Sequence, residues 1–146
     1  MAEAAHLSGK AINISKTTAC HSISYPLTAH FGIPHGHAVS LTMPIFLEFN
    51  SSVNDKNCND ERGAKFVRKR MHEIFSILGG KDSDEVKEIF SSLLNSLFKK
   101  TRLRDFNITQ ENLELILEES FTPNRINNNP RKVSKDDLRK ILKKIW

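Results

Sequence analysis

The first third of the chain carries almost no charge, and this feature most limits how the chain can fold. Between Met1 and Leu47 only Glu3, Lys10 and Lys16 bear a formal charge at neutral pH. An uncharged segment of this length is seldom left in contact with water. The segment therefore forms the core of the fold or faces another domain, and the sequence leaves both interpretations open.

The part of this segment between Ala19 and His37 holds four of the six histidines. His21 and His35 stand fourteen residues apart, on either side of a Gly32-Ile33-Pro34 break. Two helices that meet at such a break can form an antiparallel pair and bring both imidazole rings to one point. Because neutral imidazole is the commonest metal ligand for first-row divalent ions, both histidines are candidate ligands.

Two histidines do not complete a catalytic metal site, which needs about three protein ligands and an open position. His30 and His37 could contribute, although on a helix His37 points about 160° away from His35. No aspartate lies between residues 19 and 37. The histidines could equally be buried residues bonded to the backbone and water. We expect the chain to hold at most part of a metal site.

Hydrophobic spacing predicts an all-α fold of six or seven helices. The expected helices begin near residues 2, 19, 35, 60, 84, 109 and 135, and an extended linker is expected over Thr122–Lys132. We expect Pro26 to kink or stop the second helix and Pro44 to bend the third, which is apolar on all sides and should be buried. Ser134 and Asp137 form a capping box for the last helix.

The composition argues against a nucleic-acid-binding or membrane protein. The net charge is +5, but Lys and Arg alternate with Asp and Glu along the expected helices, as on a solvated face. No apolar run approaches the roughly 18 residues needed to span a membrane, and no signal peptide is visible. The two cysteines lack ligand-like spacing, so a reduced cytoplasmic location is expected.

A longer motif gives these residues a context. His21-Ser22-Ile23-Ser24-Tyr25-Pro26-Leu27 followed by Phe31-Gly32-Ile33-Pro34-His35-Gly36 resembles the signature of the iron-containing (group III) alcohol dehydrogenases. Gly9-Lys10-Ala11-Ile12 and Asn128-Asn129-Pro130-Arg131-Lys132 are similar to the family's segments at the two ends of the same region. The residues around Tyr25 are similar to those found in the branch of the family that includes phosphonoacetaldehyde reductases.

The resemblance implies that residues 1–146 are the family's all-helical C-terminal domain, and that an N-terminal NAD(P)-binding domain lies outside this sequence. It implies that His21 and His35 are the last two of four ligands to a divalent metal, with an Asp and a His upstream. Fe²⁺ is the expected ion and Zn²⁺ the alternative. The whole enzyme would transfer a hydride between a nicotinamide and a small alcohol or aldehyde, while this chain alone should be inactive and bind metal weakly.

Two further residues are expected on the substrate side of this site. Many members of the family have a histidine where this chain has Tyr25, one helical turn after the first ligand. A phenol can donate a hydrogen bond or a proton there, or Tyr25 can be a packing aromatic. His37 could line the substrate pocket, or be an ordinary core or surface histidine.

Two other functions remain open on the sequence alone. One is a stand-alone helical metal-binding module, whose site would be completed by His37 or His30. The other is a basic helical interaction domain, whose affinity for nucleic acid would fall steeply with salt. The low-charge surface that a missing domain would cover is also compatible with a homo-oligomer.

Overall fold

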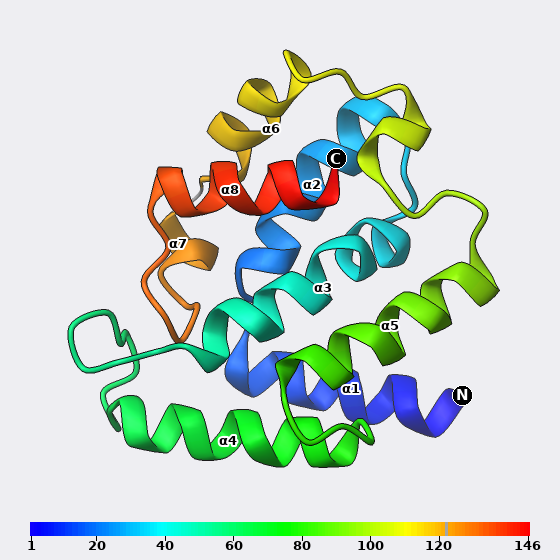
Figure 1. Ribbon diagram of the computed structural model, residues 1–146. Coiled ribbons are helices and arrows are strands. Elements are labelled where there is room, and N and C mark those ends of the chain that lie inside the picture. Colours follow the sequence, from blue (N-terminus) through cyan, green and yellow to red (C-terminus); the bar gives the residue numbers. More distant parts are fainter. Residues whose placement is uncertain (122) are drawn as a thin grey trace.

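The computed structural model describes residues 1–121 and 123–146, and in these residues the protein is built from helices (Figure 1). Seven helices have nine or more residues and two segments are single turns. In order they are α1 (Ala2–Ser15), α2 (Ala19–Phe31), α3 (His35–Ser51), α4 (Ala64–Ile77), α5 (Ser83–Leu97), the 3₁₀ turn η1 (Leu103–Phe106), α6 (Asn112–Ser120), α7 (Pro123–Ile126) and α8 (Lys135–Ile145). The predicted all-α fold is confirmed.

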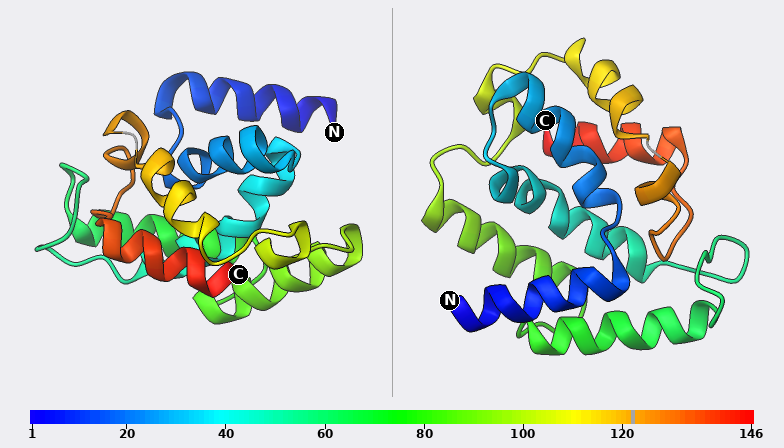
Figure 2. Two further views of the ribbon diagram at one scale, coloured as in Figure 1. Left: turned by 90° about the horizontal axis from the view of Figure 1, so that it is seen from above. Right: turned by 180° about the vertical axis from the view of Figure 1, so that it is seen from behind.

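Helix α3 lies at the centre of the structure and packs against α2, α4, α5 and α8 (Figures 1 and 2). Most of its side chains are buried, as expected for a helix that is apolar on all sides. The main core joins α2 and α3 to α6, α8 and η1, with fully buried members that include Ile23, Leu27, Ile116, Leu117 and Leu138. The low-charge segment from Ala19 onward is therefore the core of the fold.

A smaller core holds α4 to the rest of the protein. Val67, Met71 and Phe75 of α4 pack with Val53 and Val86. The helix begins at Ala64 instead of near residue 60, because a turn precedes it in which the Asp60 carboxylate accepts a hydrogen bond from the backbone N–H of Arg62 (3.0 Å).

Pro26, which the sequence predicts to kink or stop α2, does not stop it. The helix continues for five residues to Phe31 and ends at Gly32, which adopts the left-handed conformation at φ 65° that favours glycine. Pro26 is buried in the packing of α2, which contacts α3, α6 and α7. Tertiary contacts therefore maintain the helix through a residue that lacks one backbone donor. Pro44 lies inside α3 in the same way.

The segment after α6 is not the extended linker that the sequence predicts. Residues 123–126 form the single turn α7, which packs against α2, whereas Thr122 lies outside the described residues. The predicted cap of α8 is confirmed, since the Ser134 hydroxyl accepts from the backbone N–H of Asp137 (3.1 Å) and the Asp137 carboxylate accepts from the backbone N–H of Ser134 (3.1 Å).

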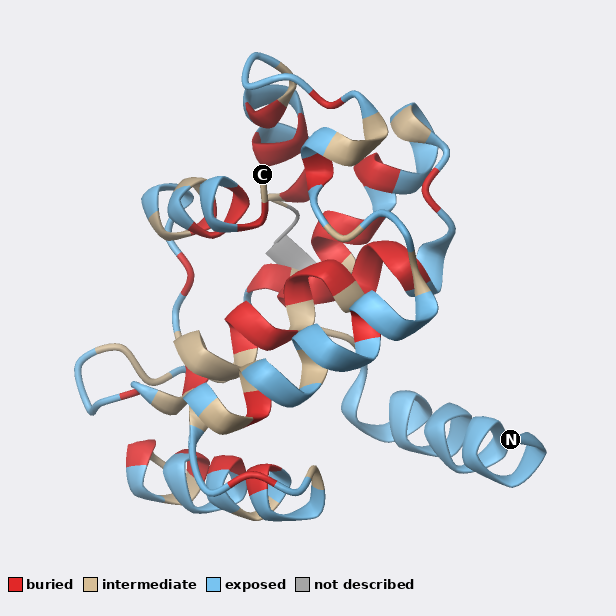
Figure 3. Cartoon of the chain, turned by 45° about the vertical axis from the view of Figure 1, so that its right-hand side comes forward, coloured by how far each residue is buried: buried red, intermediate tan, exposed pale blue. Residues whose placement is uncertain are grey.

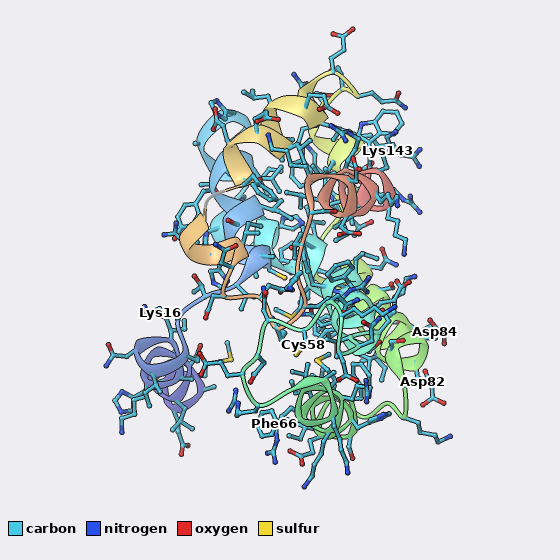
Figure 4. All side chains as sticks on the ribbon, turned by 90° about the vertical axis from the view of Figure 1, so that its left-hand side faces the viewer. Lys16, Cys58, Phe66, Asp82, Asp84 and Lys143 are labelled. Carbon is cyan, nitrogen blue, oxygen red and sulfur yellow. The ribbon has the colours of Figure 1, made fainter. Side chains whose placement is uncertain are left out.

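Helix α1 projects from the rest of the molecule and has no buried residue (Figure 3). It connects to α2 through Lys16, labelled in Figure 4, whose φ is 60°. The Asn128 side chain donates to the carbonyl oxygens of Ser15 and Thr17 (2.9 and 3.0 Å), which fixes the base of the helix. Within the described ranges, none of the helices is both long and apolar enough to cross a membrane.

Candidate metal and substrate site

His21 and His35 lie together where α2 and α3 meet. His21 is in the first turn of α2 and His35 is the first residue of α3. The chain reverses between them at Gly32–Pro34, and the two ring centroids are 5.3 Å apart with 55° between the ring planes. Both rings are thus positioned to approach one point from two helices.

Ser24 fixes the orientation of the His35 ring. The Ser24 hydroxyl donates to the carbonyl oxygen of His21 (2.8 Å) and lies 3.2 Å from Nδ1 of His35. When the one hydroxyl hydrogen is donated to His21, the hydroxyl oxygen can accept a second hydrogen bond from Nδ1–H of His35. This tautomer leaves the lone pair on Nε2, as required of a metal-binding imidazole.

The surroundings of His21 also favour a neutral ring. Burial first, and then the neighbouring His35 and Arg125, lower the pKa of His21 below the ordinary value of a histidine. The adjacent thiol is a poor ligand, because burial raises the pKa of Cys20 to about 12 and keeps it protonated.

The two imidazoles fit a divalent metal as part of its ligand set. Neutral nitrogen donors suit Fe²⁺ and Zn²⁺, and hydrogen bonding of the second ring nitrogen is usual in histidine ligands. Among the described residues, no cluster of three or more His, Cys, Asp or Glu side chains could hold an ion.

Tyr25 lies beside the histidine pair and is half exposed. Its ring centroid is 5.8 Å from that of His35, and 46 % of the residue is accessible to solvent. The guanidinium carbon of Arg125 lies 4.4 Å from the centre of the Tyr25 ring, and its Nη2 is 3.4 Å from the phenol oxygen. The phenol is thus near the pair and open to a small molecule.

Sequence reasoning did not select Arg125. The residue lies in α7, within the segment predicted as an extended linker, and no periodic pattern marks it. Its position beside Tyr25 depends on the packing of α7 against α2. An arginine in an asparagine-rich segment after a proline was the only sequence signal available.

The structure does not bring His37 to this pair. The ring is buried, Nε2–H donates to the carbonyl oxygen of Lys100 (2.8 Å), and the ring stacks on Phe98 with centroids 3.8 Å apart. Phe106 contacts it edge-on at 5.2 Å. These contacts place the His37 ring against the residues that connect α5 to η1.

The other polar candidates also lie elsewhere. Nε2 of His30 is 2.7 Å from the Glu119 carboxylate on α6, an exposed pair. Some basic side chains of the C-terminal half are paired with acids, for example Arg139 with Glu114 (2.8 Å).

Comparison with known proteins identifies the wider context. Residues 1–146 match the profile of the Fe-containing alcohol dehydrogenase family, C-terminal. The chain is 31% identical over 139 residues to the phosphonoacetaldehyde reductase of Streptomyces viridochromogenes, covering 95% of this chain and 34% of that protein. It is 28% identical over 148 residues to the NADPH-dependent butanol dehydrogenase of Clostridium saccharobutylicum, covering 96% of this chain and 35% of that protein.

A solved structure shares the fold. The sulfoacetaldehyde reductase of Bifidobacterium kashiwanohense, crystallised with NAD⁺, superposes with a TM-score of 0.69 and 31% identity over 89% of this chain and 31% of that one. The chain spans about a third of the length of the relatives that it matches. With its whole length matched to the family profile, this chain belongs to the Fe-containing alcohol dehydrogenase family and corresponds to the family's C-terminal domain.

Proposed function

We propose that this chain is the metal- and substrate-binding part of an NAD(P)-dependent reductase that interconverts a small aldehyde and its alcohol. The observation that carries the proposal is the pairing of His21 and His35, whose ring centroids are 5.3 Å apart, with the Ser24 hydroxyl 3.2 Å from Nδ1 of His35. The family assignment supports it, as do the relatives, which are named as aldehyde reductases and an alcohol dehydrogenase.

His21 and His35 would hold Fe²⁺, or alternatively Zn²⁺, which acts as a Lewis acid toward the carbonyl oxygen of the substrate. In this proposal the remaining ligands and the nicotinamide cofactor come mainly from a nucleotide-binding domain outside the sequence. Ser24 holds the His35 ring in place, and burial keeps the His21 ring neutral. Each of these effects preserves a nitrogen lone pair at the site.

Tyr25 would line the substrate side of the site. Its phenol can donate a hydrogen bond to a substrate oxygen, and its half-exposed position leaves room for a small molecule. His37 was expected on the same side. Its contacts with Phe98 and Lys100 support the alternative role of holding the segment after α5, and substitution can separate the two roles.

The alternative of a stand-alone metal-binding module receives less support. It needs a third ligand from His30 or His37, and both rings are engaged elsewhere, with Glu119 and with the Lys100 carbonyl oxygen. The charge pairing does not favour the basic interaction domain either. Lys135 and Arg139 have acidic partners, whereas Lys140 and Lys143 form no ion pair among the described residues.

Metal binding can be tested on the 146-residue chain by following the imidazole signals in NMR spectra during a Zn²⁺ titration. We expect the signals of His21 and His35 to shift together and weakly, with a dissociation constant well above that of a complete four-ligand site. His21→Ala should abolish the shift of His35, whereas His72→Ala, which removes an exposed histidine on α4, should not. A shift centred on other histidines would contradict the proposed ligands.

The reaction can be tested in a joined enzyme, in which residues 1–146 follow the nucleotide-binding domain of the Streptomyces viridochromogenes relative. We expect metal-dependent oxidation of NAD(P)H by small aldehydes. His21→Ala or His35→Ala should lower kcat/KM by more than about 100-fold, since even residues that only orient a metal ligand contribute 10–100-fold. Full activity in both variants would overturn the proposal.

A further inference from the structure

Arg125 is a cation beside the candidate site that no described acid neutralises. Arg62 and Arg139 each pair with a carboxylate, at 2.7 and 2.8 Å. Among the side chains that the structure describes, none that carries a carboxylate lies within ion-pair distance of Arg125. Between residues 17 and 47, which provide both helices of the site, the sequence contains neither Asp nor Glu. The positive charge at this position is therefore available to a ligand.

Tyr25 holds the guanidinium at a defined place relative to the histidine pair. The guanidinium carbon stacks over the Tyr25 ring at 4.4 Å, and Nη2 donates to the phenol oxygen at 3.4 Å. The Tyr25 ring is also close to the histidine pair, because its centroid lies 5.8 Å from that of His35. One aromatic side chain therefore separates the guanidinium from a candidate metal ligand.

We infer that Arg125 binds an anionic group at the end of the substrate remote from the reacting carbonyl, so that the site selects small aldehydes that end in a phosphonate, sulfonate or carboxylate. The inference rests on the proposed function of the site. It concerns which aldehydes are preferred, whereas the proposed function requires only that a small aldehyde is reduced.

The chemistry of the guanidinium suits this role. Its planar fork of N–H donors matches two oxygens of a carboxylate or of a tetrahedral oxyanion, and stacking on an aromatic ring leaves the donors at its edge free. Arg125 is partly buried and Tyr25 is 46 % exposed, so an anion can reach the donors in a partly desolvated position.

Charge-assisted hydrogen bonds set the expected size of the effect. Such bonds contribute about 1.5–3 kcal/mol, which corresponds to roughly 10- to 150-fold in binding or in kcat/KM. A neutral aldehyde of equal length makes no such contact, so its kcat/KM should depend on the guanidinium only through the effects of Arg125 on Tyr25 and His21. The ratio of the two specificity constants therefore isolates the contribution of Arg125.

Binding can be measured on the 146-residue chain with methylphosphonate as the ligand. We expect the side-chain Nε–H signal of Arg125 to shift in ¹H–¹⁵N spectra, and the ligand-induced shift of the Tyr25 signals to disappear in Arg125→Gln. The matched control is Arg104→Gln, which removes the same charge from an exposed arginine in η1. If Arg125 does not respond, or Arg104→Gln has the same effect, the inference is wrong.

Selectivity can be measured in the joined enzyme with aldehydes of matched length that end in phosphonate, sulfonate, carboxylate or methyl. Arg125→Gln should lower kcat/KM for the three anionic aldehydes by about 10- to 100-fold more than it lowers kcat/KM for the neutral aldehyde. Arg125→Lys should restore part of the loss, since a point charge replaces the planar fork.

The outcomes separate the two proposals. Equal losses for neutral and anionic aldehydes, or no loss for either, would overturn the role of Arg125 while leaving aldehyde reduction intact. If no aldehyde is reduced but methylphosphonate binding depends on Arg125, the proposed reaction fails and the anion-binding role is supported.

Discussion

Helices α1 and α2 come from the same low-charge part of the sequence, yet only α2 is buried. In α2 seven residues are buried, and Ile23 and Leu27 are fully so. In α1 none is buried, and Leu7 and Ile14 are 57% and 85% exposed. Both segments form helices, because local propensity is sufficient for that. Burial in addition needs a partner, which α2 finds in α3 and α6.

The contrast clarifies the two interpretations that the sequence left open. Residues 19–47 form the core, whereas the apolar side chains of α1 remain at the surface. The exposed apolar residues of α1 include Leu7, Ile12 and Ile14, so apolar composition alone does not bury a segment of this chain. Low charge in the N-terminal third therefore coincides with burial in α2 but not in α1, and the two helices can be compared experimentally by matched substitutions.

The largest difference is expected for one substitution made in both helices. Leu27→Ala removes a fully buried side chain from α2 and should lower the free energy of unfolding by about 2–5 kcal/mol. Leu7→Ala removes a half-exposed leucine from α1 and should change it by less than about 0.5 kcal/mol. Urea denaturation of both variants gives the two values. Similar losses would mean that α1 packs in solution and would break the contrast.

The next largest difference is expected between His37→Ala in α3 and His6→Ala in α1. His37→Ala removes the hydrogen bond to the Lys100 carbonyl oxygen and the stacking on Phe98, and should lower the free energy of unfolding by about 1–3 kcal/mol. His6→Ala on exposed α1 should have no measurable effect on stability. In the joined enzyme we expect kcat/KM to change by less than about threefold in either variant. A larger loss of activity in His37→Ala at unchanged stability would instead place His37 on the substrate side.

Much of the fold follows from local sequence signals. The capping box of Ser134 and Asp137 predicts the start of α8, and the break at Gly32–Pro34 predicts where α2 gives way to α3. Both depend only on residues close in sequence, which is why they could be predicted. The proximity of His21 and His35 follows from the same break, since the turn alone determines which side chains meet.

Features that depend on distant contacts could not be predicted. Pro26 is tolerated in α2 because neighbouring helices hold it, and its sequence signal indicates the opposite. Arg125 reaches Tyr25, one hundred residues earlier, through the packing of a single-turn helix without periodicity. The direction of the His37 ring is set by Phe98 and Lys100, which a helical wheel of α3 does not include.

The smallest expected effect is a dependence of the free energy of unfolding on pH. It should be present for the charged part of the chain and absent for α1. Glu48 of α3 accepts hydrogen bonds from Lys144 (2.9 Å) and Lys87 (3.2 Å). The hydrogen bond from Lys144 lowers the pKa of Glu48 below the ordinary glutamate value of 4.5, against the opposing effect of burial and with further help from Lys87. Because the folded-state pKa is lowered, the stabilisation is present above the unfolded-state pKa near 4.5 and is lost as the pH falls through the lower, folded-state value.

We therefore expect Glu48→Gln to lower the free energy of unfolding by up to about 1 kcal/mol at pH 7, with the difference from wild type shrinking below pH 4.5. Glu3→Gln removes the same charge from α1, where no ion pair forms among the described residues, and should leave the pH profile unchanged. Urea denaturation between pH 3 and pH 7 gives both curves. The effect of Glu48→Gln should also weaken in high salt, since all three side chains are partly exposed. A constant difference across this pH range would mean that Glu48 stabilises α3 by packing and not through its charge.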